Sequence, residues 1–252
     1  MTLIRWKLST TELNRATLFM SSAPGTLLLF DIDGTLLDTR GAGAGALLDA
    51  TEEVLGMERE KIPPLDLAGA TDGAVIRKLF ADAGQPLEQG RVEAFQKCYL
   101  ARLEARLHHA EFPGRLLNGV TTLLPRLAGE SHFSLGLLTG NWRAGARLKL
   151  ERFGIHGHFI EGGFGDDGEH RNDLGPVAVR RMEAATGRSF APHQVIVIGD
   201  TPKDIACAHA MGARCLAVAT GVFAHASLLP FAAWQVLESL EDTEALLQVL
   251  AA

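Results

Sequence analysis

The chain of 252 residues has few cysteines, no surplus of basic side chains and no long apolar run. Its three cysteines, Cys98, Cys207 and Cys215, match no zinc or redox spacing, so we expect packed thiols in a reducing compartment. Lys and Arg number 24 against 30 Asp and Glu, which argues against a nucleic-acid-binding surface. No run of about 18 apolar residues occurs, which argues against a membrane span. These absences predict a cytoplasmic protein without nucleic-acid or membrane partners.

The first residues of the chain show no pattern that would join them to the folded core. Residues 1–19 contain Arg5 and Lys7 but no continuous apolar segment, which argues against a secretory signal. Met20 stands shortly before the first apolar run and would be a natural start. We therefore expect residues 1–19 to form a peripheral extension.

The rest of the chain divides into a core and an insert. Apolar residues make up 47% of the sequence, enough to build a sizeable core. Residues 40–110 show apolar stripes with helical spacing and no strand pattern, so we predict a helical insert there. Pro113 and Gly114 mark the return from it, and residues 20–39 and 111–252 would form the core domain.

The core segments alternate between predicted strands and predicted helices. Such alternation is typical of an α/β fold with a doubly wound, Rossmann-like parallel sheet. The expected strands lie at 26–30, 133–139, 158–160, 194–198 and 214–219. The expected helices lie between 141 and 154 and at 174–186, 201–211 and 241–252, with Asn141 and Asp173 as N-caps of the first two.

Two carboxylates follow the first predicted strand directly. Asp31 and Asp33 come after the apolar run 26–30, at the end of a strand where open α/β sheets bind their ligands. Gly34 then permits a sharp turn and a close approach to a ligand. An isolated Asp-Gly-Thr is commonly only a turn. Because buried negative charge is unfavourable unless a cation or a reaction requires it, we predict a functional role for the pair.

Two further strand ends carry polar side chains. Thr139 follows one predicted strand, and Asp200 and Asp204 follow another. In a parallel sheet these ends lie along one edge, so the side chains would share a crevice with Asp31. Mg²⁺ would relieve the repulsion among the carboxylates and also binds phosphate oxygens. We predict a magnesium site that handles phosphate, although the spacing of Asp204 from Thr201 also fits a helix capping box.

Three segments resemble signature motifs of the haloacid dehalogenase superfamily. They are Phe30-Asp31-Ile32-Asp33-Gly34-Thr35-Leu36, Leu137-Leu138-Thr139-Gly140-Asn141 and Ile198-Gly199-Asp200-Thr201-Pro202-Lys203-Asp204. They occur in the order of that family, and the resemblance extends over roughly residues 26–223. It implies that the helical insert is the cap that such enzymes place over their active site.

The resemblance also implies a mechanism and a set of site residues. Asp31 would be the nucleophile that forms an aspartyl-phosphate, and Asp33 would act as general acid and base. Mg²⁺ would be held by Asp31, the backbone carbonyl of Asp33 and Asp200, with Asp204 in support. Thr139 would donate a hydrogen bond to a phosphoryl oxygen. Further substrate contacts are expected from Gly34, Thr35, Gly140 and Asn141.

The fourth signature of the family departs from its usual form. The family has a lysine followed by a proline ahead of the helix before the last motif, whereas this chain reads Arg171-Asn172-Asp173-Leu174. We predict that Arg171 replaces the lysine, because a guanidinium can bridge Asp31 and a phosphate bidentately. Lys203, in the acidic loop, is the alternative.

One loop of the helical insert bears on the substrate. Residues 68–73, Ala-Gly-Ala-Thr-Asp-Gly, resemble the specificity loop of phosphoglycolate-phosphatase-like members. Thr71 and Arg77 would contact the leaving group and favour a small anionic metabolite. We therefore expect a phosphate monoester hydrolase (a phosphatase) with a small phosphorylated metabolite as substrate, phosphoglycolate first, active as a monomer or homodimer.

Other functions remain as alternatives. A phosphomutase of the beta-phosphoglucomutase type uses the same aspartyl-phosphate and differs mainly in keeping water out. A haloacid dehalogenase is the nearest other enzyme, but it has no use for the acid at Asp33. A receiver-type signalling module also places aspartates and Mg²⁺ at strand ends, yet it is much shorter and needs no cap.

Overall fold

The computed structural model of the chain describes residues 25–251, so the predicted extension at 1–19 and the start at Met20 lie outside the described part. At its centre is a six-stranded sheet in the order β5-β4-β1-β6-β7-β8, with every pairing parallel. This confirms the predicted doubly wound α/β sheet. The strands are β1 (Thr26–Phe30), β4 (Phe133–Leu138), β5 (Gly162–Gly163), β6 (Val195–Gly199), β7 (Arg214–Val218) and β8 (Gln235–Leu237).

The sequence of β1 explains its central place. Leu27, Leu28, Leu29 and Phe30 have no exposed surface. Leu28 and Phe30 join the hydrophobic cluster on one face of the sheet, and Leu27 and Leu29 join the cluster on the other. A continuous apolar run is typical of a parallel strand that is covered on both faces. Asp31, the next residue, therefore emerges at the end of a strand that is buried on both faces.

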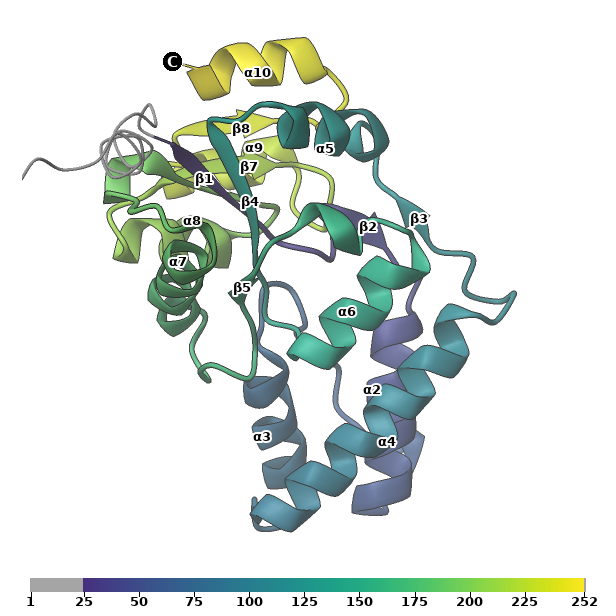
Figure 1. Cartoon of the computed structure of the whole chain (residues 1–252). Coiled ribbons are helices and arrows are strands. Elements are labelled where there is room, and N and C mark those ends of the chain that lie inside the picture. The colour runs from purple at the N-terminus through teal and green to yellow at the C-terminus, as the bar shows by residue number, and fades with distance from the viewer. Residues whose placement is uncertain (1–24, 252) are drawn as a thin grey trace, which may run out of the picture.

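Helices cover both faces of this sheet (Figure 1). They are α5 (Val120–Gly129), α6 (Arg143–Arg152), α7 (Arg171–Thr186), α8 (Pro202–Ala210), α9 (His225–Leu228) and α10 (Thr243–Ala251), with 3₁₀ turns at His156–His158, Pro192–Gln194 and Leu229–Phe231. Apolar side chains of α5, α6 and α10 pack with Leu28 and Phe30, and those of α7 and α8 pack with Leu27 and Leu29. No helix in the described part of the chain is both long and apolar enough to cross a bilayer.

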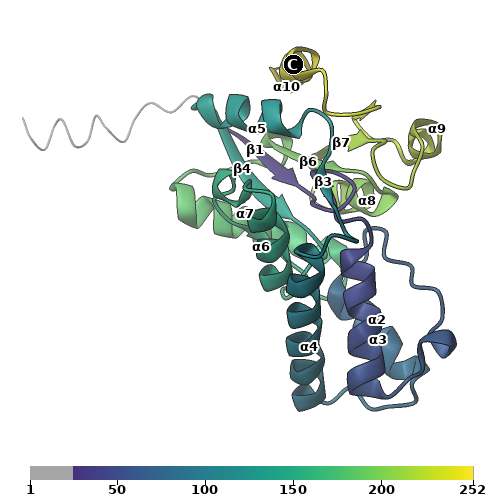
Figure 2. The ribbon, with the colours of Figure 1, turned by 90° about the vertical axis from the view of Figure 1, so that its right-hand side faces the viewer.

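The helical insert contains helices and no strand. They are α2 (Ala42–Leu55), a 3₁₀ turn (Arg59–Lys61), α3 (Asp72–Asp82) and α4 (Gln89–Leu107). A short antiparallel pair, β2 (Leu37–Asp38) and β3 (Arg115–Leu116), borders the insert and sets Asp38 opposite Arg115. The insert has its own apolar cluster, in which Leu79, Phe95 and Leu103 are fully buried. Figures 1 and 2 show its helices gathered below the sheet.

The structure corrects the expected strand at 158–160. The chain forms a 3₁₀ turn that ends at His158, and the edge strand β5 follows at Gly162 and Gly163. The backbone at Gly162 approaches β4 so closely that a Cβ there would lie 2.5 Å from the carbonyl oxygen of Leu137. The apolar residues at 158–160 therefore indicated the wrong segment. The strand forms at two glycines instead, because at Gly162 there is no room for a side chain beside β4.

The expected N-caps of two helices are also wrong. α6 begins only at Arg143, and the side-chain oxygen of Asn141, which would have to accept the capping hydrogen bond, accepts one from Nζ of Lys149 instead. α7 begins at Arg171, so Asp173 lies inside its first turn, where a negative charge stabilises the helix dipole. The earlier start of α7 places Arg171 at the edge of the sheet where Asp31 emerges.

Candidate active site

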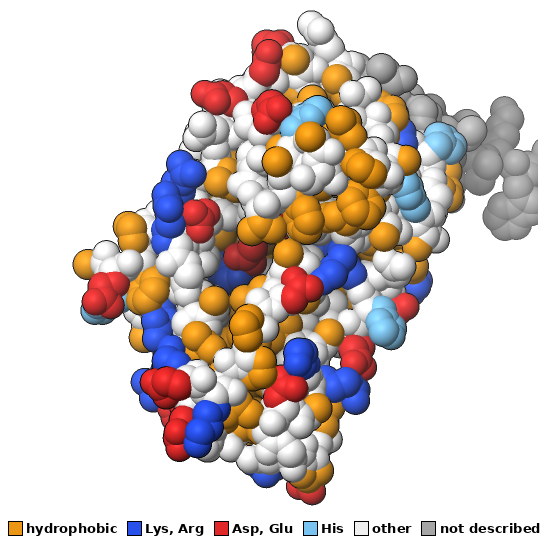
Figure 3. Space-filling model, turned by 180° about the vertical axis from the view of Figure 1, so that it is seen from behind, with side chains coloured by type: hydrophobic (Ala, Val, Ile, Leu, Met, Phe, Trp, Pro, Cys, Tyr) orange, Lys and Arg blue, Asp and Glu red, His pale blue; other side chains and the backbone are white. Residues whose placement is uncertain are grey.

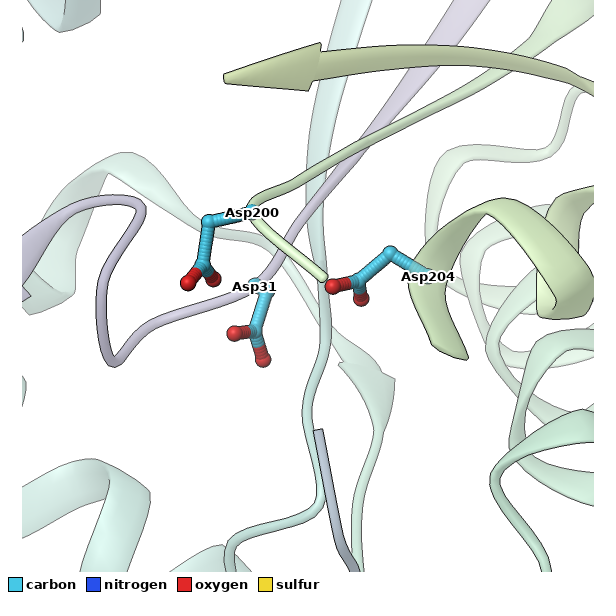
Figure 4. Close-up of side chains that lie close together, drawn as sticks. All are labelled: Asp31, Asp200 and Asp204. Atoms are coloured by element: carbon cyan, nitrogen blue, oxygen red, sulfur yellow. The ribbon is translucent and has the colours of Figure 1, made fainter. Parts of the chain in front are cut away.

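Three aspartates from two strand ends and one helix meet at the carboxyl edge of the sheet. Asp31 follows β1, Asp200 follows β6, and Asp204 lies in the first turn of α8. One carboxylate oxygen from each lies within 4.8 Å of the others (Figure 4). All three residues are buried, with Asp204 fully so. A set of carboxylate oxygens this close together could hold a divalent cation.

Burial and neighbouring charges shift the pKa values of two of these aspartates. Burial raises the pKa of Asp31 to about 6, although the charge of Arg171 acts in the opposite direction. Burial, together with the charges of Asp31 and Asp204, raises the pKa of Asp200 to about 8. Both shifts mean that the site disfavours the negative charge it contains, so an added cation would be strongly attracted.

Arg171 is the cation that the structure places among the carboxylates. Its Nη2 lies 2.8 Å from Oδ1 of Asp31 and 2.5 Å from Oδ1 of Asp204. Burial alone would lower the pKa of Arg171, but attraction to Asp204 and Asp31 outweighs it and raises the pKa. Its Nε is buried and has no hydrogen-bond partner among the described residues.

The alternative cation, Lys203, does not reach this cluster. Its side chain is half-exposed, and its Nζ lies 3.7 Å from Asp66 of the helical insert. Asp204 also forms the capping box expected from its spacing, because its Oδ2 accepts hydrogen bonds from the backbone and hydroxyl of Thr201. With Oδ1 on Arg171, Asp204 has both oxygens engaged, which leaves Asp31 and Asp200 as the more available metal ligands.

Asp33 is not part of the cluster of three aspartates and instead binds two nitrogen donors. Its Oδ2 accepts hydrogen bonds from Nδ2 of Asn141 at 2.8 Å and from Nζ of Lys149 at 2.6 Å. Asn141 Nδ2 also lies 2.8 Å from the Thr139 hydroxyl oxygen, which leaves that hydroxyl hydrogen free to donate elsewhere. Lys149 was missed by the sequence analysis, and its position within a charged helix offered no signal for it.

These groups surround a cavity of about 390 Å³ between the sheet and the helical insert. Figure 3 shows the molecule from behind, where a hollow near the centre reveals recessed acidic and basic side chains. The residues predicted from sequence that line it are Asp31, Asp33, Gly34, Thr139, Gly140, Asn141, Arg171 and Asp200. The ends of β1, β4 and β6 therefore form one wall of the cavity, and residues 67–70 of the insert contribute to its lining as well.

Three predicted substrate contacts do not line this cavity. Thr35 is fully buried and donates to Asp200 Oδ1 at 3.2 Å, which supports that carboxylate from behind. Thr71 is the N-cap of α3 and donates its hydroxyl hydrogen to the carbonyl of Glu169. Arg77 forms an ion pair with Glu169 on the surface, and its side chain is 58% exposed.

Two glycines let the chain approach the site closely. Gly34 has φ +81°, and a Cβ there would lie 2.4 Å from Oδ2 of Asp200. A Cβ on Gly140 would lie 1.9 Å from the carbonyl oxygen of Ala70, so this glycine allows the insert to rest on the sheet edge. The Asp72 backbone N–H donates to the Gly140 carbonyl at 2.8 Å at the same contact.

Comparison with known proteins places this site in a wider context. A family model described as haloacid dehalogenase-like hydrolase matches residues 28–218, which include all the strand ends of the site. A phosphoglycolate phosphatase of Rhodospirillum rubrum is 27% identical over 203 residues, covering 77% of this chain and 79% of that protein.

Two solved structures have the same fold. A hydrolase from Pseudomonas syringae gives a TM-score of 0.68 at 21% identity, over 90% of this chain and 100% of that one. A protein described as a putative beta-phosphoglucomutase from Thermotoga maritima gives a TM-score of 0.58 at 19% identity, over 89% of this chain and 99% of that one. At these identities the likeness establishes the fold alone.

Proposed function

Because the chain belongs to the haloacid dehalogenase-like hydrolase family, we propose that it is a Mg²⁺-dependent phosphatase that works through an aspartyl-phosphate on Asp31. The observation that most supports this is the convergence of Asp31, Arg171 and Asp200 at one end of the sheet. A phosphoryl group placed beside Asp31 would meet a nucleophile and a guanidinium together. Relatives named as phosphatases act on phosphorylated substrates, in agreement with that chemistry.

Two steps complete the reaction. First, an oxygen of Asp31 attacks phosphorus, the bond to the ester oxygen breaks, and Asp33 gives a proton to the departing alcohol. Then Asp33 takes a proton from a water molecule, whose oxygen attacks phosphorus and releases phosphate and free Asp31. Arg171 would balance charge on the phosphoryl oxygens, and Thr139 would donate a hydrogen bond to one of them.

The donor set favours Mg²⁺ over softer metals, because all of its side-chain atoms are carboxylate oxygens. Asp31 and Asp200 would hold the ion with the backbone carbonyl of Asp33, and Asp204 would support them. When bound, Mg²⁺ would supply positive charge that orients the phosphoryl group and reduces its repulsion from Asp31.

Phosphoglycolate is the substrate we propose first, with Arg115 as the residue that recognises its carboxylate. Apart from Arg171, Arg115 is the one Lys or Arg among the described residues that line the main cavity. It lies on β3, opposite Asp38, whose own ion-pair partner is Arg40. Arg77, which the sequence suggested for this task, lies outside the cavity and is paired with Glu169.

Release of inorganic phosphate tests the proposal. Wild type should release phosphate from p-nitrophenyl phosphate and phosphoglycolate with Mg²⁺ and lose this activity in a chelator, while Asp31→Asn should be inactive. A phosphomutase is the second candidate, because it would use the same aspartyl-phosphate on Asp31. It would transfer the phosphoryl group to a second hydroxyl of a sugar phosphate instead of to water.

A further inference from the structure

A buried ammonium group, that of Lys149, binds Asp33. Lys149 belongs to α6, and only 4% of its surface is exposed. Its Nζ lies 2.6 Å from Oδ2 of Asp33 and 2.6 Å from Oδ1 of Asn141. Both partners come from the signature segments of the active site, so Lys149 connects a helix of the core to two candidate site residues.

A buried ion pair is weak evidence for a contribution to stability. Burying an ammonium group is unfavourable, and apolar side chains of similar volume are often as stabilising as such a pair. The side chain of Lys149 is itself buried. The helix thus places a charged group at a position where packing alone would favour an apolar one.

The hydrogen bonds on Asp33 are asymmetric. Asn141 and Lys149 both donate to Oδ2. Among the described residues, no side-chain or backbone donor binds Oδ1. Asp33 lines the main cavity and its side chain is 42% exposed, whereas Lys149 does not line that cavity. One oxygen of Asp33 is therefore held from behind and the other is free.

Given the proposed phosphatase function, we infer that Lys149 is a positioning residue, which holds Asp33 by Oδ2 so that Oδ1 serves the leaving-group oxygen and then the attacking water. The arrangement suits both steps. A carboxyl group protonated on Oδ1 still accepts two hydrogen bonds on Oδ2, and so does the carboxylate left after it has given its proton away.

The test must separate this positioning role of Lys149 from direct binding of the substrate. A second cavity of about 200 Å³ adjoins the site between α2, α3, α4 and α6, and its lining includes Asp33, Asp72, Tyr99 and Lys149. A leaving group that entered this cavity would touch the ammonium directly. Lys149 would then recognise the charge of the substrate rather than position Asp33.

The experiment compares substrates that differ in how much they need a proton donor. An alkyl alcohol is a poor leaving group and needs a proton from Asp33, whereas p-nitrophenolate leaves without one. The substrates are glycerol phosphate, phosphoglycolate and p-nitrophenyl phosphate, each with Mg²⁺. The variants are Lys149→Met, which removes the charge, and Lys149→Arg, which retains it. Lys203→Met serves as the control at an exposed lysine.

The positioning role predicts a specific pattern in kcat/KM, which covers the steps up to formation of the aspartyl-phosphate. For Lys149→Met, kcat/KM should fall by about tenfold to a hundredfold with both alkyl phosphates. With p-nitrophenyl phosphate it should change by less than about threefold. Lys149→Arg should recover part of the loss, and Lys203→Met should behave as wild type.

Other outcomes overturn the inference. An equal loss on all three substrates would indicate a merely structural role, and a loss confined to the KM of phosphoglycolate would indicate direct recognition of the substrate. No loss at all would also refute it. If Lys149→Met does not fold, as judged by its circular dichroism, Lys149→Gln takes its place. A wild type inactive on every substrate would instead contradict the proposed phosphatase function.

Discussion

Nη2 of Arg171 lies 2.8 Å from Oδ1 of Asp31, and both side chains are only 5% exposed. A residue that the sequence places 140 positions away thereby becomes the positive charge that, in the described part of the chain, is paired with the proposed nucleophile. The same guanidinium group binds Asp204, so one side chain links the start of α7 to the end of β1 and the first turn of α8.

Replacing Arg171 should therefore affect both activity and stability. Arg171→Ala should lower phosphate release by about a hundredfold or more, because a charge-balancing donor is lost. It should also lower the free energy of unfolding by about 3 kcal/mol, since two buried carboxylates lose their partner. Arg171→Lys should retain part of the activity and part of the free energy of unfolding. Steady-state kinetics and urea unfolding measure the two effects.

The control for this change is Lys203→Ala, at the lysine that the sequence offered as the alternative cation. Its half-exposed side chain lies 3.7 Å from Asp66 and outside the carboxylate cluster, so activity should stay near the wild-type value. Loss of activity in Lys203→Ala with an active Arg171→Ala would reverse the assignment.

Removal of divalent metal should abolish phosphate release, and added Mg²⁺ should restore it. Because Mg²⁺ would bind the folded protein through its clustered carboxylates, it should also raise the melting temperature of the wild type. Asp200→Asn should show little of this rise, since it loses one of the two more available ligands. Differential scanning fluorimetry at increasing Mg²⁺ is the measurement, and equal shifts in both proteins would contradict the proposed site.

Arg115→Ala should weaken the recognition of phosphoglycolate. We expect KM to rise by about tenfold with a small change in kcat, because a charged hydrogen bond to the substrate carboxylate is lost. The KM for p-nitrophenyl phosphate, which lacks that carboxylate, should stay the same. Arg77→Ala is the matched comparison and should leave both values unchanged; the opposite result would return the role to Arg77.

Asp72 should make stability depend on pH. Burial raises its pKa to about 6, even though Lys149 acts in the opposite direction, while Asp33 and Asp166 add to the rise. Since the unfolded chain gives up this proton first, the wild type should lose stability as the pH rises from about 4 to about 6. Asn resembles the protonated carboxyl and can still accept the hydrogen bond of the Trp142 backbone.

As the pH rises over that range, the free energy of unfolding of Asp72→Asn should therefore increase relative to that of the wild type, by up to about 3 kcal/mol at pH 7. Urea unfolding at a series of pH values measures the difference. Asp66→Asn, at an aspartate that is 83% exposed, is the control and should follow the wild type. Parallel curves for Asp72→Asn and wild type would show that the ionisation of Asp72 does not oppose folding.

The central strands could be predicted from the sequence because each is a short apolar run buried on both faces. The runs at 26–30, 133–139 and 194–198 correspond to β1, β4 and β6 within one residue at either end. Their ends carry the polar groups of the site, so the approach of Asp31, Thr139 and Asp200 to one cavity followed from the parallel sheet.

Less regular elements gave no such signal. α5 (Val120–Gly129) was not predicted and contains Pro125, a residue that usually interrupts helices. β8 (Gln235–Leu237) was also not predicted, since it is short and only partly buried at the sheet edge. Neither element contributes a residue to the main cavity.

Side-chain partners were harder to predict than backbone. Lys149 occurs in a helix with several charged neighbours, and only the folded chain shows that it is buried against Asp33. Arg77 has the spacing of a substrate contact, yet Glu169 lies near enough to bind it at the surface. Both depend on which distant segments of the chain meet in the fold, and this information is absent from local patterns.

The pairing of Asp38 with Arg115 brings the two ends of the long connection between β2 and β3 next to each other. The segment between them therefore enters and leaves the core at one place, without interrupting the order of the strands in the main sheet. The chemical groups on the sheet edge would survive an exchange of this segment, apart from the lining that the insert provides. A change in the insert would thus alter which substrates fit the cavity, while the reacting residues at the edge of the sheet stay the same.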